Sequence, residues 1–268
     1  MAAKLNITIA PLNYADIDAC ATISRDSFAI DPHTIVKQLG RDGYDMYGMA
    51  RRGYLANLER RNMVFVKAVD VDTGAVVGYG GWVFPHVKKE LVPWIGPSDE
   101  KSKEEVEEQK QTDDKAAHRS EEPKREPDAI DRLHAMEDED MQYFQHKLIP
   151  AGEPCMIVMG LVVAPAHQSR GVGSALLRHG NAIADRLGVP VWVHSSHQAV
   201  EAYGKGGFEP VRTLDVDLDE YAPRPPRDDE PVMGDKGSGK WGHYVIQYMK
   251  RESRKRPVGE KAVPERGA

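Results

Sequence analysis

Hydrophobic positions along the chain follow two periods, one typical of β-strands and one typical of helices. Alternating or continuous apolar runs predict strands over residues 5–10, 63–71, 75–84, 155–164, 189–193, 208–218 and 244–249. Apolar residues spaced three or four apart predict helices over residues 14–28, 48–61, 128–148, 172–187 and 196–205. The run at 155–164 (CMIVMGLVVA) is almost wholly apolar. We therefore expect it to be a strand buried on both faces.

Between the third strand and the helix at 128–148, the pattern is lost. Residues 88–127 are charged, polar and nearly free of aromatic side chains, which is typical of a solvated or disordered insertion. The stretch 99–140 holds 17 acidic and 8 basic residues. We interpret 88–127 as a spacer and the helix at 128–148 as a lid that packs on the domain beside an acceptor cleft. Residues 221–240 are expected to form a loop.

Composition excludes several classes of protein. Apolar runs fall short of the roughly 20 residues that span a bilayer, so we do not expect a membrane protein. The formal net charge of −6 offers no general attraction for nucleic acid, and we predict no nucleic-acid partner. The ten His and two Cys show no ligand spacing, so we predict no metal. Two distant cysteines and no evident signal peptide indicate a reducing, cytoplasmic location.

The end of the chain is basic. Residues 250–268 include 7 basic and 3 acidic side chains, a composition consistent with nuclear import or a nucleic-acid contact. We favour a plain soluble end, because no aromatic residues are interleaved with the charges. We expect it to be untethered beyond Lys250.

A glycine-containing turn carries the strongest chemical signal. Residues 168–173 read Gln-Ser-Arg-Gly-Val-Gly and lie between the apolar strand and the helix at 172–187. Glycines allow a tight turn and a close approach of backbone to ligand, and the helix start presents free amides and the positive end of its dipole. Such a turn suits phosphate. It lacks the Lys-Ser/Thr of a nucleotide P-loop and the three glycines of a dinucleotide site.

Two signatures make the sequence resemble the GCN5-related N-acetyltransferase (GNAT) superfamily. Gln168, Gly171 and Gly173 match Arg/Gln-x-x-Gly-x-Gly/Ala, and about 30 residues later Ala199, Tyr203, Gly207 and Phe208 match Ala-x-x-x-Tyr-x-x-x-Gly-Phe. The resemblance is clearest over residues 154–217. It implies an α/β fold: a mixed, mostly antiparallel sheet of about seven strands with a splayed centre, flanked by helices on both faces.

The resemblance also implies roles for individual residues. The coenzyme A pyrophosphate is expected on the backbone amides of Gln168, Ser169, Arg170, Gly171, Val172, Gly173 and Ser174. The pantetheine arm is expected to pair with Leu161, Val162 and Val163. Tyr203 is expected to protonate the leaving thiolate, a reasonable task for a tyrosine hydroxyl.

Two positions leave the chemistry open. Many relatives have Asn where this chain has Ser196, and we expect its hydroxyl to cap the following helix and still contact the cofactor arm, with Ser195 sharing the task. Some relatives carry the base as a Glu on the strand at 155–164, but no acid lies there in this chain, so a base on this strand is excluded unless water and backbone carbonyls do the work. His194 and His197 are the candidates, because a histidine near pKa 6.5 can accept a proton; His167 is expected to be exposed.

We expect one domain over residues 1–250 with an insertion at 88–148, followed by a basic tail over 251–268. The predicted activity is transfer of an acetyl group from acetyl-CoA to a primary amine, most simply of a small molecule, by direct attack in a ternary complex. A protein or peptide N-acetyltransferase and a non-catalytic acyl-CoA-binding module are the alternatives. An acidic lid would favour cationic amines or basic peptides.

Overall fold

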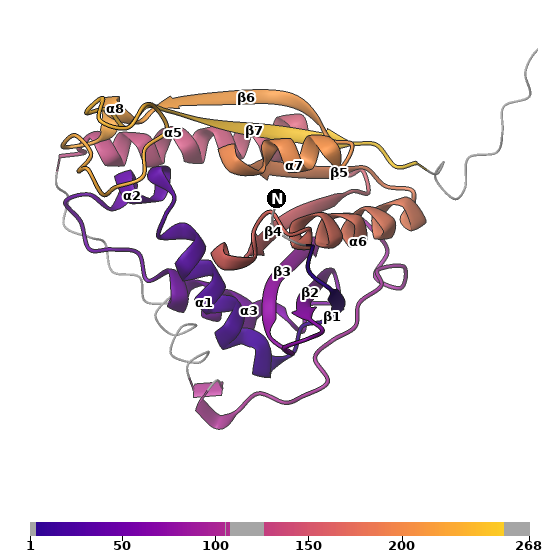
Figure 1. The fold of residues 1–268 in the computed structure, drawn as a ribbon. Helices are drawn as coiled ribbons and strands as arrows, with labels where there is room; N and C mark the ends of the chain where they lie inside the picture. Colours follow the sequence, from indigo (N-terminus) through magenta and orange to yellow (C-terminus); the bar gives the residue numbers. More distant parts are fainter. Residues whose placement is uncertain (1–3, 105, 108–125, 255–268) are drawn as a thin grey trace, which may run out of the picture.

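A single mixed sheet organises the molecule (Figure 1). The computed structural model describes residues 4–104, 106–107 and 126–254, and within them seven strands have the order β1-β2-β3-β4-β5-β7-β6. All neighbours are antiparallel except β4 and β5. The strands are β1 (Ile7–Pro11), β2 (Met63–Asp70), β3 (Val76–Val83), β4 (Met156–Val163), β5 (Val191–Ser195), β6 (Glu209–Asp217) and β7 (His243–Arg251). The predicted mostly antiparallel sheet is confirmed.

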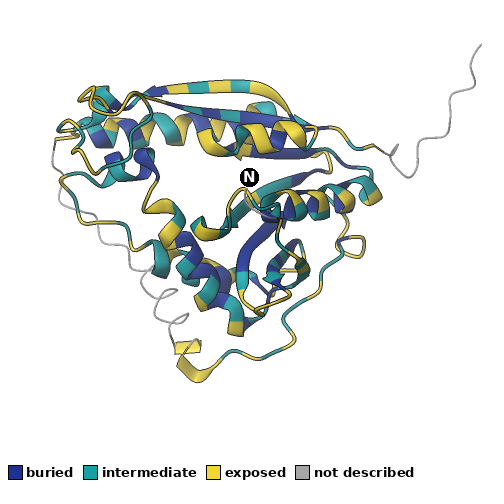
Figure 2. Cartoon of the chain, viewed as in Figure 1, coloured by how far each residue is buried: buried dark blue, intermediate teal, exposed yellow. Residues whose placement is uncertain are grey.

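Helices cover both faces of this sheet, as predicted, with their inner sides buried and their outer sides exposed (Figure 2). The α-helices are α1 (Ile17–Phe28), α2 (Pro32–Gln38), α3 (Met46–Asn57), α5 (Ala129–Tyr143), α6 (Val172–Leu187), α7 (Val200–Lys205) and α8 (Leu218–Tyr221). Short 3₁₀ or π turns are η1 (Tyr14–Asp16), η2 (Phe144–Leu148), η3 (Pro165–His167) and η4 (His197–Ala199).

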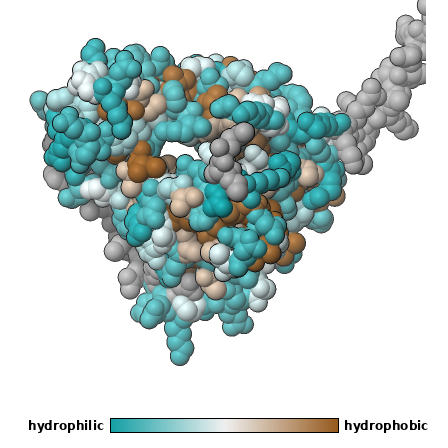
Figure 3. Space-filling view, in the orientation of Figure 1, coloured by the Kyte–Doolittle hydropathy of each residue, from teal (hydrophilic) through white to brown (hydrophobic). Residues whose placement is uncertain are grey.

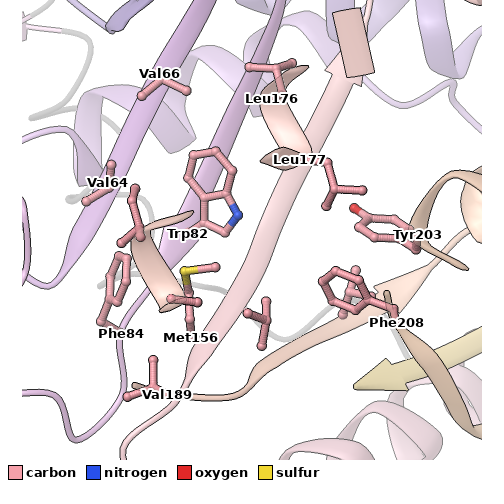
Figure 4. Packing of buried hydrophobic residues seen from close by; sticks show 14 of the residues in the cluster. Val64, Val66, Trp82, Phe84, Met156, Leu176, Leu177, Val189, Tyr203 and Phe208 are labelled. Carbon is pink, nitrogen blue, oxygen red and sulfur yellow. The ribbon is translucent and has the colours of Figure 1, made fainter. Parts of the chain in front are cut away.

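Strand β3 shows how the two helical layers are held. Tyr79 points to one face, where its hydroxyl lies 2.6 Å from the Ser24 hydroxyl of α1. Trp82 is fully buried on the opposite face, beneath α6 (Figure 4). A Cβ at Gly180 of α6 would lie 2.6 Å from the Trp82 ring, so only glycine lets the helix come this close. The α6 face and the α1 face are therefore separate layers on one sheet.

Helix α5 packs on the other half of the sheet, on the same face as α1. Its extension η2 places Phe144 against Tyr248 and Trp192, with ring centroids 4.7 and 6.2 Å apart. Asp128 caps the helix by accepting a hydrogen bond from the amide of Asp131 at 3.0 Å. The expectation that 128–148 packs on the domain is thus confirmed.

The interpretation of residues 88–127 as a spacer is wrong for its first part. Val92 is buried and Trp94 packs against the main core. The Asp99 carboxylate accepts hydrogen bonds from the amides of Tyr14 and Ala15 at 2.9 and 2.8 Å, which satisfies free donors at the start of η1. These few contacts hold the polar segment 88–104 against the domain. The remainder of the expected spacer, at 105 and 108–125, lies outside the described residues.

The chain end also departs from expectation. Strand β7 continues to Arg251, whose buried guanidinium donates to both oxygens of Asp185 at 2.9 and 2.8 Å. The amide of Arg254 donates to the same carboxylate at 2.9 Å. Residues 251–254 are therefore tethered, because a buried arginine needs its paired carboxylate. The rest of the basic tail, 255–268, lies outside the described residues.

Candidate active site

The two parallel strands at the centre of the sheet separate soon after they meet. β4 and β5 pair only through Met156 with Val191 and Ile157 with Trp192, although both strands run further. Beyond Ile157, β4 keeps β3 on one side, and no strand of the described residues pairs with its other edge, which is open. The predicted splayed centre is confirmed, and we call this point the fork. In the space-filling view an opening passes through the molecule between α5 and α1 (Figure 3).

The fork explains why one expectation about β4 is wrong. The strand was expected to be buried on both faces, yet residues beyond Met156 are only partly buried and Met159 is exposed. Burial of a central strand requires a neighbour on each edge, and β5 has moved away. Met159 also sits at a bulge: Trp82 pairs with Val158, whereas Gly81 pairs with Gly160.

The glycine turn lies against the open end of β4. Gly171 has φ +89° and Ser169 has φ +57°, both in the left-handed region. A Cβ on Gly173 would lie 3.6 and 3.8 Å from side-chain atoms of Val163 and Leu161, and the Gln168 amide donates to the Val163 carbonyl at 3.2 Å. The structure thus brings these predicted residues together, while Val162 packs on the α1 side.

The start of α6 is free of a side-chain cap. Its N-cap residue is Gly171, which has no side chain to accept from the amides of Val172, Gly173 and Ser174. The helix runs for 16 residues, so its dipole adds to the donor character of this turn. The turn is also bound to the start of the chain, because the Leu5 amide donates a hydrogen bond to the Arg170 carbonyl at 3.1 Å. An anion would find free amides here.

Tyr203 lies on the same face of the sheet as α6. Its ring is almost fully buried between Leu177 and Phe208, packing edge-on against Phe208 at 5.2 Å (Figure 4). Burial raises the pKa of Tyr203 well above its usual value, because the phenolate would lose its hydration. The hydroxyl therefore keeps its proton at neutral pH.

His194 lies on the opposite face, near the end of β5. Its ring is tilted over Tyr248 at 5.1 Å. His194 is exposed, and partial desolvation by the surrounding protein atoms lowers the pKa of its ring below 6.5. The Glu137 carboxylate opposes that shift without cancelling it. A neutral imidazole at pH 7 can accept a proton.

The central part of the chain matches known proteins. Residues 135–210 match a family model described as an acetyltransferase (GNAT) domain, from within α5 to the start of β6. This match covers the fork, the glycine turn and Tyr203. The resemblance inferred from the two signatures is confirmed, and the observed sheet is the GNAT fold.

Solved structures share this GNAT fold at low sequence identity. A Corynebacterium glutamicum protein described as histone acetyltransferase HPA2 and related acetyltransferase is 16% identical, with a TM-score of 0.51 over 96% of this chain and 100% of its own. Arylalkylamine N-acetyltransferase 2 from Aedes aegypti is 13% identical, with a TM-score of 0.51 over 92% and 99%. No curated protein matches the sequence. These likenesses establish the fold.

The serines at the GNAT fork behave differently from expectation. Ser196 does not cap the following helix; its side chain faces the Tyr244 hydroxyl instead. Ser195 is buried and donates to the Ser196 carbonyl at 3.1 Å, which occupies its hydroxyl hydrogen. The capping expectation is wrong, because the Ser196 side chain is turned toward Tyr244 and not toward the amides of η4.

The other histidines are less suited to proton transfer than His194. His197 accepts a hydrogen bond from the Val245 amide on Nδ1 at 3.1 Å, so its neutral ring carries the proton on Nε2 and has no free lone pair. His167, expected to be exposed, is half-buried, and its Nδ1 is enclosed without a partner among the described residues. The turn η3 folds this ring inward.

One polar cluster of the structure was not predicted. Asp31 accepts from the amide and hydroxyl of Thr34 at 2.9 and 2.8 Å and from the Gln198 amide at 3.0 Å. Gln198 in turn accepts from the Tyr244 hydroxyl at 3.2 Å. This cluster joins α2 to η4 and β7. Asp31-Pro32 is a helix-start signal that would have revealed α2, but nothing local indicates partners so distant in sequence.

The two cysteines are buried in separate parts of the domain. Cys20 lies in α1, where burial and the nearby Asp16 carboxylate raise its pKa to about 12. Burial raises the pKa of Cys155 to about 11. Both are thiols at neutral pH and therefore weak nucleophiles. Within the described ranges, no three His, Cys, Asp or Glu side chains are grouped as metal ligands, and every helix is too short or too polar to cross a bilayer.

Proposed function

We propose that this GNAT domain transfers the acetyl group of acetyl-CoA to the primary amine of a small molecule, by direct attack in a ternary complex. The observation that carries the proposal is the fork: two parallel strands separate directly beside the uncapped start of α6. An open strand edge and free helix amides are the two features that an extended arm ending in phosphates requires.

The glycine turn and the open strand edge fit the donor. Gln168, Ser169, Arg170 and the first turn of α6 would hold the pyrophosphate through backbone amides. The open edge of β4 at Leu161, Val162 and Val163 would pair with the pantetheine amides, with Ser196 at the opposite side of the fork. Gly173 lies in van der Waals range of Leu161 and Val163, so the phosphate site and the strand edge are continuous.

The two proposed catalytic residues lie on opposite faces of the sheet. His194, on the α5 side, would take the proton of the attacking amine as the C–N bond forms. Tyr203, on the α6 side, would give its proton to the thiolate as the C–S bond breaks. The raised pKa of Tyr203 and the lowered pKa of His194 leave each in the protonation state its role needs. Solvent then restores both groups.

Direct attack is favoured over a covalent acetyl-enzyme, because Cys20 and Cys155 are both buried thiols that keep their protons at neutral pH. Tyr203 is also the feature that argues against a purely acyl-CoA-binding module, since binding alone needs no proton donor at the thiolate.

Calorimetry with acetyl-CoA, followed by thiol release in the presence of a panel of amines, tests the proposal. We expect saturable binding and thiol release that depends on the amine. Absence of acetyl-CoA binding would refute it. Binding without thiol release for any small amine or basic peptide would instead support the non-catalytic module, and release with peptides alone would support protein acetylation.

A further inference from the structure

A groove runs along α3 on the face of the sheet opposite α6. Its volume is about 310 Å³. Phe28 of α1 and Met49 and Gly53 of α3 form its walls, and Phe65, Gly81 and Gly160 of β2, β3 and β4 form its floor. We call it the α3 groove. It is separate from the glycine turn assigned to the donor pyrophosphate, which lies on the α6 side of the sheet.

Two features of the sequence create the α3 groove. Gly81 and Gly160 are direct partners across β3 and β4, so their missing side chains leave a gap at one place in the floor. Along α3 the lining residues recur at helical spacing, at Met46, Met49, Ala50, Gly53 and Asn57. Small residues at 50 and 53 keep this face of the helix from filling the space.

The lining of the α3 groove carries no formal charge. None of its lining residues is Asp, Glu, Lys, Arg or His. The Ser24 hydroxyl donates to the Cys20 carbonyl at 3.0 Å, so the Tyr79 hydroxyl, 2.6 Å away, donates to Ser24 and has no hydrogen left for a ligand. A charged group placed here would lose its hydration without gaining a partner of opposite charge.

The rim of the α3 groove exposes apolar side chains. Met159, Met49 and Phe28 are 58%, 51% and 37% exposed, although they are among the largest apolar residues of the chain. Exposed apolar side chains gathered around a concave site indicate a ligand with an apolar body. Methionine is well suited to such a lining, because its flexible thioether adapts to aromatic and aliphatic groups.

One end of the α3 groove reaches the fork. Met159 and Gly160 line the groove and directly precede Leu161, Val162 and Val163, where we place the donor arm. Met159 is the bulged residue at which β4 has already lost contact with β5. A molecule lying in the groove therefore has one end at the point where the thioester would lie.

Resting on the proposed function, we infer that the α3 groove binds the body of the acceptor, and that the acceptor is a primary amine with an uncharged, apolar body, an arylalkylamine or alkylamine. The amine group would lie at the fork, where His194 or water would accept its proton. Polyamines, aminoglycosides and lysine-rich peptides do not fit, because their further charges would enter the uncharged groove.

Steady-state thiol release with four amines tests this assignment. We expect kcat/KM for 2-phenylethylamine and hexylamine to exceed that for spermidine and kanamycin by about tenfold or more. Higher kcat/KM for spermidine or kanamycin would overturn the inference while leaving acetyl transfer intact. If acetyl-CoA itself does not bind, the proposed function fails, and the groove assignment fails with it.

Variants at Gly53 separate the groove from the donor site. A Cβ there would meet no atom within 4 Å, so Gly53→Leu extends into open space without disturbing the fold. We expect it to lower kcat/KM for 2-phenylethylamine by about tenfold or more, with unchanged acetyl-CoA affinity. Gly53→Ala, the matched control, should stay near wild type. Ala50→Leu is a second variant whose added side chain fills the α3 groove. Wild-type kinetics in both leucine variants would show that the acceptor binds elsewhere.

Discussion

Gly81 and Gly160 stand directly opposite each other on β3 and β4, at the step where the register between these strands shifts. On one side of the pair Trp82 faces Val158, and on the other Gly80 faces Leu161, so one extra residue, Met159, bulges from β4. The bulge and the missing side chains occur at the same place. The bulge of β4 and the floor of the α3 groove thus lie at the same glycine pair.

The two glycines are predicted to differ in their tolerance of alanine. A Cβ on Gly81 would lie 2.8 Å from the Phe65 ring, so Gly81→Ala forces that ring to move. We expect a loss of about 1–3 kcal/mol in the free energy of unfolding, measured with urea. Gly160→Ala is the matched control, because its Cβ would lie 3.8 Å from Tyr79, an ordinary contact. Equal losses in both variants would contradict the steric explanation.

The turn before α6 is tested by charge at Gly171. Asn and Asp both tolerate the left-handed conformation seen here at φ +89°, so the two variants share the same backbone cost. Gly171→Asp adds a negative charge at the amides proposed to hold the pyrophosphate. We expect it to weaken coenzyme A binding at least about tenfold more than Gly171→Asn does, by calorimetry. Equal affinities would remove this turn from the donor site.

The assignment of His194 predicts a pH dependence. Only the neutral ring can accept a proton, and partial desolvation lowers its pKa below 6.5, so kcat should hold at pH 7 and fall only below pH 6.5. His194→Gln should lower kcat and abolish this acidic limb. His197→Gln should keep the limb, because His197 Nδ1 already accepts from the Val245 amide. An unchanged acidic limb in His194→Gln would exclude it as the base.

Much of the fork was predictable because its signals are local. The apolar strand, the turn with Gly171 and Gly173, and the amphipathic helix after them follow one another in the chain, so pattern and spacing identify them together. Tyr203 was identified through the resemblance to the GNAT signature, by its spacing to Ala199 and Phe208. Local sequence patterns are enough to predict a site when the elements that form it are neighbours in the sequence.

The rest depended on contacts between distant segments. Burial of β4 was overestimated, since the divergence of β5 after Trp192 has no signature in either strand. The ordering of 88–104 rests on Val92, Trp94 and Asp99, too few residues to alter a polar composition. The α3 groove forms only when Gly81 and Gly160, far apart in sequence, become cross-strand partners.

Glu137 is predicted to stabilise the junction of α5 and α2 in a pH-dependent way. Burial would raise its pKa, but His33 and Lys37, whose Nζ lies 2.5 Å away, lower it from 4.5 to about 2. The ionised form is thus favoured by folding, and its contribution is complete above pH 4.5 and lost as pH falls toward 2.

The corresponding experiment compares urea unfolding at several pH values. Glu137→Gln should lose no more than about 3 kcal/mol at pH 7, with a difference from wild type that shrinks between pH 4.5 and 2. Glu139→Gln, an exposed carboxylate on the same helix, should behave as wild type. A constant difference across this pH range would mean that packing, not charge, is lost.

Tyr203 provides the sharpest test of the chemistry. Tyr203→Phe keeps the ring that packs edge-on against Phe208 and removes only the hydroxyl, so folding and acetyl-CoA affinity should hold. The proton is needed only as the thiolate leaves, so kcat should fall by roughly 10²-fold or more while KM changes little. A thioester with a more acidic leaving thiol should partly rescue the variant. Tyr143→Phe, on the exposed end of α5, should match wild type. Wild-type turnover in Tyr203→Phe would make the residue a packing group, and the thiolate would then take its proton from solvent.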